Sequence, residues 1–539
     1  MKKIFSFVFF ITLGCFTFQT WADDVYYVSP TGSDTSNGSS PSAAFKTLAK
    51  AIASVTLGAS ATIYLEEGGE FNSPATVIIG EGRDVTIVGK NTTVKSGVNP
   101  YFGQRILQFS TGTNAKISGI TFRNGCTRGG IPGGAIFFEG DKLEIDSCSF
   151  IENEGNNSGA AIACRGKELT ITNSVFHQNR AYSGYGYGGV LWFSGPYPAT
   201  TDNAGSLIIR NCAFTENQSH TDTHGEVISL GHAYRASEDK TGPAGGIANG
   251  FTNVKYFELT NCLFKGNINA GASSTLTGGE KAAEVSLFKH YYALEANIIN
   301  NTFYNSKALM VGDFIRFDGI LRMVNNVFYN KDNYTIYFQS GTDARDPFIA
   351  WNNAVVGEMV NVDDVQFYSE RTQYGNQLFV GSDIAKLKMA MYTENAGSYV
   401  TYLPITDASS PLIDKGLSST AGKEGFDKEY IPATDIRGVA VSGVKDIGSF
   451  EFPSSSGLAG IAANSLYSLA SNGEVATVKN LTGKPLNLKI YLVDGRCIYR
   501  ASVAEEVNIH RSELEVPGGI LIVEVNNDQV NDSKKVILF

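Results

Sequence analysis

The sequence predicts an all-β fold, a parallel β-helix, in which one short unit is stacked repeatedly on itself. A motif of polar residues followed by phenylalanine recurs along the chain, and its phenylalanines lie 25 to 28 residues apart in the most regular stretches. The apolar runs are short and rich in Ile, Val, Phe and Tyr, and no copy carries an apolar stripe at helical spacing. A fixed period of this size indicates a unit that buries its apolar side chains only when stacked.

Two residue types recur at fixed places in the unit and predict two columns in the stack. The repeated phenylalanines are Phe122, Phe150, Phe176, Phe214, Phe264, Phe303 and Phe328. The repeated asparagines are Asn173, Asn211, Asn261, Asn300, Asn325 and Asn352. We expect the rings to stack inside. We expect the asparagines to hydrogen-bond from coil to coil, because asparagine also tolerates the left-handed backbone of a tight turn. Longer gaps, as between Phe176 and Phe214, are interpreted as the same unit with an inserted loop.

A second strand is predicted after each phenylalanine. Its copies are residues 133–138, 159–164, 188–193, 227–230, 285–288, 314–317 and 336–339. Two strand types in each period predict coils that pair with the coils above and below them, about 4.8 Å away.

The copies also carry a family resemblance. A Gly-Gly-Ala-Ile type of strand combined with Phe-x-x-Asn, as at residues 150–153, 176–179, 214–217 and 264–267, resembles the repeats of polymorphic outer-membrane proteins. It is also similar to the pectate-lyase-like superfamily. This resemblance covers roughly residues 25 to 400 and implies a right-handed parallel β-helix (solenoid). It implies little about activity, because the fold hosts lyases, hydrolases, epimerases and adhesins.

The first 22 residues have the pattern of a signal peptide. Lys2 and Lys3 precede an apolar segment at 4–18, and Thr20, Trp21 and Ala22 form a small-residue cleavage site. A lipoprotein site at Cys15 fits less well. No later stretch is long and apolar enough to span a membrane. The chain is therefore expected to be exported, to the cell surface or the extracellular space.

The composition is acidic. The chain has 43 Lys and Arg against 53 Asp and Glu, a formal net charge of −10, and the predicted leader removes two more basic residues. An acidic surface disfavours nucleic acid and anionic membranes as partners.

The β-helix is predicted to occupy residues 23–452, with capping segments at both ends. Residues 45–55 read as a helix with Leu48, Ile52 and Val55 on one face, which would cover the open end of the stack. Asp34 and its neighbours allow a calcium loop, but a plain turn fits the spacing better. No Cys or His pair has metal-ligand spacing, so no metal or other cofactor is predicted.

Three cysteines occupy one repeat position, two residues before the phenylalanine. They are Cys148, Cys212 and Cys262. A disulfide between Cys212 and Cys262 is conceivable in an exported protein. Small buried thiols fit better, because parallel Cβ vectors on a stacked ladder suit a disulfide torsion poorly.

The far end of the chain carries two further patterns. Residues 410–416, 435–438 and 446–451 resemble the segment that closes many bacterial surface β-helices. We interpret its carboxylates and Arg437 as a salt-bridged turn that seals the last coil, in preference to a catalytic set. A linker at 453–463 and a small C-terminal β-sandwich at 464–539 follow. The strands at 489–496, 517–525 and 534–539 resemble, in this order, the C-terminal sorting domain of the type IX secretion system, which implies the secretion machinery as a partner. The alternative is an ordinary sandwich module.

The second strands provide a candidate ligand site on their outward face. Alternation of side chains predicts an outward column of Phe137, Ala163, Trp192, Ser229, Leu287, Arg316 and Phe338. Just past it lie charged residues such as Glu139, Arg165 and Lys289. An exposed aromatic row flanked by charges fits a sugar polymer, because sugar faces stack on rings and Arg or Lys can pair with uronate carboxylates. The candidate residues are Phe137, Glu139, Arg165, Trp192, Lys289 and Arg316.

The insertion after Asn179 provides a second candidate site. It is rich in glycine and holds Tyr185, Tyr187, His224, His232 and Arg235. Long loops on a rigid scaffold often carry function. The alternative is a loop that packs its own tyrosines over the sheet.

Three functions fit these patterns. They are a surface protein that binds glycan or another partner without catalysis, a polysaccharide lyase or glycosidase, and a structural adhesin. The first and third are favoured, because no acid–base set recurs at one depth of the stack. Glu139 and Asp318 are several coils apart, whereas a glycosidase needs two carboxylates about 5 to 9 Å apart. A lyase could still use Arg165, Lys289, Arg316 or the loop residues.

Overall fold

The computed structural model describes residues 24–97, 103–128, 131–155, 159–181, 189–196, 204–219, 225–230, 254–269, 283–288, 294–304, 309–312, 320–329, 336–338, 348–356, 360–362, 372–375, 378–381, 384–387, 389, 392–393, 401–441, 443–452, 467–471, 475–480, 486–492, 497–510, 519–526 and 531–538. The predicted leader and most of the inserted loop lie outside these residues. Contacts divide the chain into two units, Met1–Ser382 with Thr393–Tyr402, and Asp383–Tyr392 with Leu403–Phe539. The predicted boundary after residue 452 and the linker at 453–463 stay predictions.

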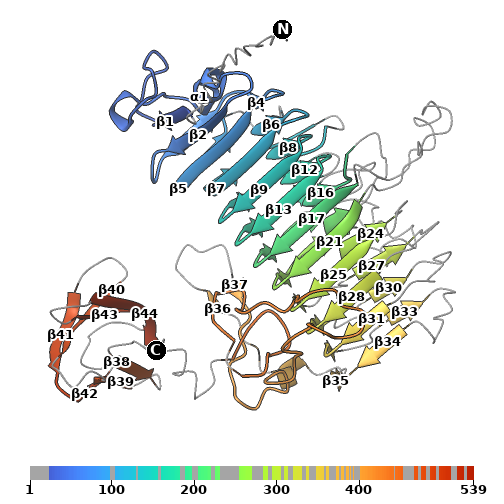
Figure 1. The fold of residues 1–539 in the computed structure, drawn as a ribbon, viewed down its shortest axis with the longest axis vertical. Helices are drawn as coiled ribbons and strands as arrows, with labels where there is room; N and C mark the ends of the chain where they lie inside the picture. Colours follow the sequence, from blue (N-terminus) through green and yellow to red (C-terminus); the bar gives the residue numbers. More distant parts are fainter. Residues whose placement is uncertain are drawn as a thin grey trace, which may run out of the picture. The chain divides into compact units, whose positions relative to one another are not determined.

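The first unit is an all-β solenoid of stacked coils, as predicted (Figure 1). Its largest sheet has 21 strands and forms two ribbons. The first ribbon contains β1 (Asp24–Val28), β2 (Ser60–Leu65), β5 (Asp84–Ser96), β7 (Asn114–Arg123), β9 (Lys142–Asp146), β13 (Glu168–Thr172), β17 (Gly205–Arg210), β21 (Val254–Thr260), β25 (Glu295–Ile299), β28 (Ile320–Val324), β31 (Phe348–Trp351) and β34 (Thr372–Gly375). The second ribbon contains β3 (Glu70–Ser73), the ends of β5 and β7, β10 (Ser149–Ile151), β14 (Val175–His177), β18 (Ala213–Thr215), β22 (Leu263–Lys265), β26 (Thr302–Tyr304), β29 (Val327–Tyr329), β32 (Ala354–Val356) and β35 (Leu378–Gly381).

A ten-stranded sheet forms a further wall of the solenoid. It contains β4 (Val77–Ile79), β6 (Leu107–Phe109), β8 (Ile136–Phe138), β12 (Ile162–Cys164), β16 (Leu191–Phe193), β20 (Gly225–Leu230), β24 (Ala283–Phe288), β27 (Leu309–Gly312), β30 (Ile336–Phe338) and β33 (Val360–Val362). A small sheet contains β11 (Glu154–Gly155), β15 (Arg180–Ala181), β19 (Gln218–Ser219) and β23 (Ile268–Asn269). Neighbouring coils pair in parallel, so each repeat position forms a column along the axis.

The column of phenylalanine rings is confirmed. From Phe122 to Phe328 each ring stacks on the next, with centroids 4.7 to 5.5 Å apart and planes within 18°. Every ring of the column is fully buried. The spacing between Phe176, Phe214 and Phe264 matches that between Phe150 and Phe176, although their coils differ greatly in length. The longer gaps are therefore extra chain between otherwise equal coils.

The column of asparagines at the turn between the two ribbons is also confirmed. All six predicted asparagines have φ between 50° and 61°, the left-handed region. Asn211 donates a hydrogen bond from Nδ2 to Oδ1 of Asn173 at 3.2 Å, and Asn261 donates likewise to Asn211 at 2.8 Å. Asparagine fits this position because its side chain bonds locally while its backbone tolerates positive φ.

The asparagine of Phe-x-x-Asn forms a second, buried ladder. In Asn217, Oδ1 accepts the backbone and side-chain N–H groups of Asn179, each at 3.0 Å. Its Nδ2 donates to the carbonyl of Phe176 at 2.9 Å and to Asn267 at 3.0 Å. These polar groups are therefore satisfied inside the stack, as buried polar groups must be.

The register of the ten-stranded sheet corrects two sequence predictions. Leu287 pairs with Leu230 and Phe338 with Val311, which places both in the column of Phe138, not in the outward column. Phe288 then occupies the predicted place of Lys289. The strand before β30 is β27, not residues 314–317 with Arg316. A slip of one residue exchanges the two faces of a strand, and two apolar runs with the same alternation compete for this coil.

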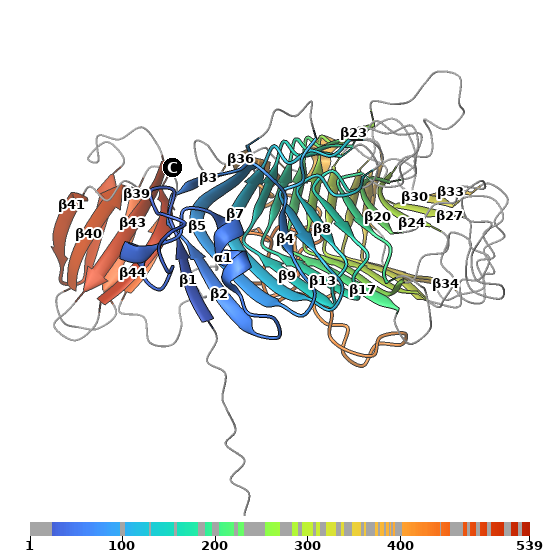
Figure 2. The same cartoon turned by 90° about the horizontal axis from the view of Figure 1, so that it is seen from above.

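The end of the solenoid at β1 is capped as predicted. The helix α1 (Leu48–Ser54) buries Leu48, Ala51 and Ile52 and packs against β1 and β4 (Figure 2). It is preceded by a short 3₁₀ turn, η1 (Pro41–Ala43). Asp34 accepts hydrogen bonds from the backbone N–H groups of Lys46 and Thr47 and from the Thr47 hydroxyl, each at 2.9 Å. These bonds fix the start of the helix and give Asp34 a structural role.

The repeated cysteines are thiols that fill space beside the phenylalanine column. Cys148, Cys212 and Cys262 are buried, and no disulfide is present among the described cysteines. Burial raises the pKa of Cys148 to about 12. Such thiols are poor nucleophiles, because the thiolate is the reactive form.

The second unit ends in two antiparallel sheets. The first contains β38 (Tyr467–Ser471), β39 (Val475–Asn480) and β42 (Glu506–His510), and the second contains β40 (Leu486–Leu492), β41 (Cys497–Val503), β43 (Gly519–Asn526) and β44 (Asn531–Leu538). Three short elements lie in the sequence between the last strand of the solenoid, β35, and the first strand of these sheets, β38. They are η4 (Ile384–Leu387), β36 (Tyr392–Thr393) and β37 (Thr401–Tyr402). Strands were predicted near β40, β43 and β44, and all three are present.

Candidate anion-binding site

The structure gathers four of the predicted site residues on the outward face of the ten-stranded sheet. Register aligns Gln108, Phe137, Ala163 and Trp192 on neighbouring strands β6, β8, β12 and β16. Phe137, Ala163 and Trp192 pack together as one apolar cluster. Glu139 and Arg165 each follow their strand by one residue and therefore lie beside it. Seven other predicted residues lie outside the described residues: Lys289, Arg316, Tyr185, Tyr187, His224, His232 and Arg235.

The prediction that this aromatic row is exposed is wrong. Phe137 is 7 % and Trp192 is 3 % exposed. Two guanidinium groups lie against the rings, with Arg105 4.7 Å from the Phe137 centroid and Arg165 5.9 Å from the same centroid. The rings therefore do not offer a face for a sugar to stack on. Instead, the two rings support cations, and we call this pair of rings the Phe137–Trp192 bed. The attraction of a cation to an aromatic face is worth about 0.5–2 kcal/mol.

Arg105 is fixed on this bed. It is buried, and it donates hydrogen bonds from Nε to the carbonyl of Gly133 at 3.0 Å and from Nη1 to Gln108 at 2.6 Å. It also donates to the carbonyl of Pro132. Burial lowers the pKa of Arg105 to about 10, and the charge of Glu139 opposes this shift. The group remains charged at neutral pH, and its donors are committed to the protein.

Arg165 differs from Arg105, because its donors are not committed. The guanidinium is half-buried and lies 5.5 Å from the Trp192 centroid as well as beside Phe137. Within the described part of the chain it has no hydrogen bond or ion pair. A planar guanidinium with uncommitted N–H groups suits a two-point bond to a carboxylate or sulfate.

Glu139 adds an acceptor beside Arg165. Its carboxylate is partly exposed and lies on the preceding coil, and the described residues form no ion pair or hydrogen bond with it. Arg165 and Glu139 together offer donors for an anion and an acceptor for hydroxyl groups. This combination fits an acidic sugar better than an isolated anion, because an isolated anion would meet the carboxylate without compensation.

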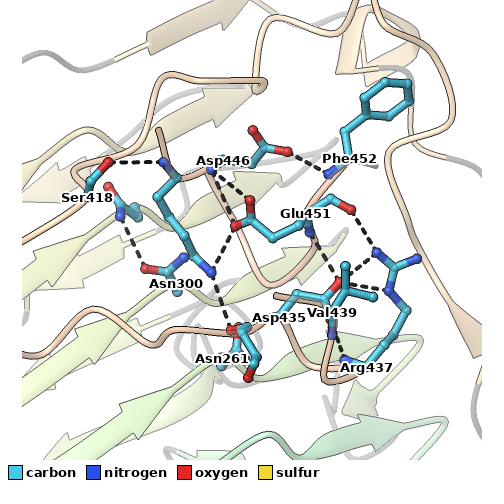
Figure 3. Close-up of polar contacts among 12 residues, drawn as sticks. Asn261, Asn300, Ser418, Asp435, Arg437, Val439, Asp446, Glu451 and Phe452 are labelled. Carbon is cyan, nitrogen blue, oxygen red and sulfur yellow. Dashed lines mark hydrogen bonds and ion pairs between the residues drawn. The ribbon is translucent and has the colours of Figure 1, made fainter. Parts of the chain in front are cut away.

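A second polar cluster, in the second unit, has a structural arrangement. Lys445 is fully buried, pairs with Glu451 at 2.8 Å and donates to the carbonyl of Thr434 at 3.3 Å. Arg437 donates to Asp435 at 2.6 Å and to the Glu451 carbonyl at 2.8 Å (Figure 3). Each charged group is satisfied by the turn that carries it, which supports the predicted salt-bridged turn over a catalytic set.

Two further sets of outward residues were not predicted from the sequence. Arg105 precedes its strand in a column that holds small residues in later coils, and nothing in the repeat marks it. The outward ladder of the second ribbon was detectable. It consists of the residue that follows each stacked phenylalanine, and it includes His177, Thr215, Lys265 and Tyr304.

Within the described ranges, no cluster of three or more His, Cys, Asp or Glu side chains is arranged to hold a metal ion. None of the described helices has the length and hydrophobicity to cross a bilayer.

Comparisons with known proteins add little to this site. No family model matches the chain, and no curated protein matches its sequence. A rhamnogalacturonan lyase is similar in structure, with a TM-score of 0.33 and 13 % identity over 66 % of this chain and 87 % of the lyase. A surface adhesin of Streptococcus pneumoniae, PfbA, has a TM-score of 0.31 and 12 % identity over 67 % of this chain and 92 % of the adhesin. At this level of similarity neither protein identifies a ligand or a reaction for this chain.

Proposed function

We propose that this chain is an exported surface protein that binds an acidic glycan without catalysis, through Arg165 and Glu139 on the Phe137–Trp192 bed. The observation that carries the proposal is the Arg165 guanidinium, held on two rings with its N–H groups uncommitted within the described structure. A uronate offers a carboxylate for Arg165 and hydroxyls for Glu139. A polymer of repeated uronates also suits a site on a straight, rigid scaffold, because it presents the same acid group many times along its length.

Replacing Arg165 by methionine tests this site. We expect Arg165→Met to lower the affinity for polygalacturonate by about tenfold or more, because a hydrogen-bonded charge pair contributes about 1.5–3 kcal/mol. Affinity would be measured by isothermal titration calorimetry on the mature chain, with heparin as a sulfated arm and dextran as a neutral control.

Lys116→Met is the matched control for lost charge, because Lys116 is already paired with Glu144 at 3.0 Å. Equal losses in the two variants, or no binding of either acidic polymer, would contradict the site. Release of unsaturated sugar from polygalacturonate would instead favour the lyase alternative.

Export is part of the same proposal. The proposal rests on the three sequence pieces that resemble a sorting domain, which fall at strands β40, β43 and β44. We therefore expect a chain ending at residue 463 to accumulate in the periplasm of its own cell, while the full chain reaches the surface. Cell fractionation with antibody detection distinguishes the two. Equal surface display of both chains would leave 464–539 as an ordinary module.

A further inference from the structure

The second ribbon carries an outward ladder of polar side chains on neighbouring coils. Register aligns His177 on β14 with Thr215 on β18, then with Lys265 on β22 and Tyr304 on β26. The next residue, Tyr329 on β29, packs against the Tyr304 ring at 5.2 Å. The underlying phenylalanines set the rungs 4.7 to 4.9 Å apart over these coils. The advance per pyranose unit in an extended chain is close to this spacing.

Within this ladder, Lys265 is the residue that points to an anionic ligand. Its ammonium is half-buried, yet it has no ion pair or hydrogen bond within the described residues. Burial lowers the pKa of Lys265, and the charge of Glu216 opposes this shift. A partly desolvated, unpaired ammonium is unfavourable for folding and is compensated when an anion binds.

Cations elsewhere in the same column are paired. Lys95 forms an ion pair with Glu70, and Arg123 forms one with Glu152 at 2.7 Å. Glu152 belongs to a column of residues with positive φ that continues through Gln178 and Glu216 and changes to Gly266 on the coil of Lys265. Gly266 therefore adds no side chain beside Lys265 on its own coil, and the nearest side-chain atom to the place of its missing Cβ is Cγ of Glu216, at 3.6 Å.

The neighbouring rungs supply the groups that a sugar needs. Glu216 is exposed and accepts a hydrogen bond from Gln178 at 3.0 Å, which leaves further acceptor capacity for hydroxyls. The Tyr304 ring is partly exposed, and its hydroxyl has no partner in the described structure. A half-exposed tyrosine offers both a face for a sugar ring and a hydrogen bond. His177 is held by its Nδ1 contact with the Thr215 hydroxyl at 2.9 Å.

We infer that this ladder is a second carbohydrate site, which binds an acidic glycan lying along the solenoid axis, with an acid group at Lys265 and a sugar ring on Tyr304. The site lies on a different sheet from the Arg165 cluster and does not rest on it. The shared chemistry is a linear chain of hydroxylated, anionic sugars, whether the acid is a carboxylate or a sulfate.

Binding stoichiometry separates the two sites. Titration of the mature chain with tetragalacturonate, and in a parallel arm with heparin tetrasaccharide, should show two bound molecules per chain. Lys265→Met should lower the affinity of one site by about tenfold, or abolish it, and leave the other unchanged. Tyr304→Ala should weaken the same site, and Arg165→Met should remove only the other one.

Lys95→Met is the matched control, because it removes a paired cation from the same column. Circular dichroism would confirm that each variant is folded. The inference is overturned if Lys265→Met and Tyr304→Ala bind both oligosaccharides as the parent chain does, or if Lys95→Met causes the same loss. Loss of binding in Arg165→Met alone would leave the first site standing and remove this one.

Discussion

Truncation of Phe214 to alanine is expected to lower the free energy of unfolding of the solenoid by about 3–5 kcal/mol. The ring is fully buried and stacks on Phe176 at 4.7 Å and on Phe264 at 4.9 Å. Both neighbours are held by the hydrogen bonds of their coils, so they cannot close the cavity. The loss therefore includes the ring's transfer to water and two stacking contacts, each worth about 0.5–1.5 kcal/mol beyond area burial.

Chemical denaturation followed by tryptophan fluorescence measures this loss. After removal of the leader, the chain retains Trp192 and Trp351, which both lie in the first unit. The signal therefore reports on the solenoid and not on the C-terminal sheets. Phe214→Leu is the matched control and should cost less, because it leaves a smaller cavity. A loss below about 1 kcal/mol for the alanine variant would show that the column contributes little.

Replacing Lys445 by methionine is expected to destabilise the 403–452 segment by about 3–5 kcal/mol. The change would remove the cation that the buried Glu451 carboxyl contacts, and losing one partner of a buried ion pair is costly. The double variant Lys445→Met with Glu451→Gln should recover most of the loss, because it buries no net charge. Hydrogen exchange with mass spectrometry on peptides covering 430–452 follows this segment directly.

The same pair predicts a pH dependence. Burial raises the pKa of Glu451 to about 7, against the attraction of Lys445. A carboxyl with a raised folded pKa binds its proton more tightly in the folded state. Its contribution to stability is therefore complete below its ordinary pKa and is lost as the pH rises through about 7. Protection from exchange should fall between pH 5 and 8 in the parent chain, and Glu451→Gln should flatten this fall. An equal fall in both would assign the dependence to other groups.

The parts of this fold that the sequence predicts are those in which one residue type repeats at one position. The phenylalanine column, the left-handed asparagines and the buried thiols follow from such repetition, because every coil imposes the same surroundings. The cap helix was also recognisable, although it begins at Leu48 and not at Phe45. Phe45 instead forms a bridge with Val28 and packs in the core.

The candidate site was only partly predictable. Phe137 and Trp192 were placed on the correct face, because Ile136 and Phe138 fixed the alternation. The burial of Phe137 was not predictable, since its ring is covered by Arg105, which lies 32 residues earlier on the preceding coil and has no counterpart in the repeat. The register of one coil was mispredicted, because β27 pairs with β24 and β30 where residues 314–317 were expected. Arg316 itself lies outside the described residues. Lys265 was overlooked because its significance lies in a missing partner, and a sequence does not display missing contacts.

The equal rise of unequal coils has an evolutionary consequence. Coils that differ by more than twenty residues keep the same distance between Phe150, Phe176, Phe214 and Phe264. Segments can therefore be gained or lost at the corners without a change in pitch. Such a scaffold can acquire new specificities by exchanging corner segments as cassettes, while selection on the aromatic spine keeps the framework constant.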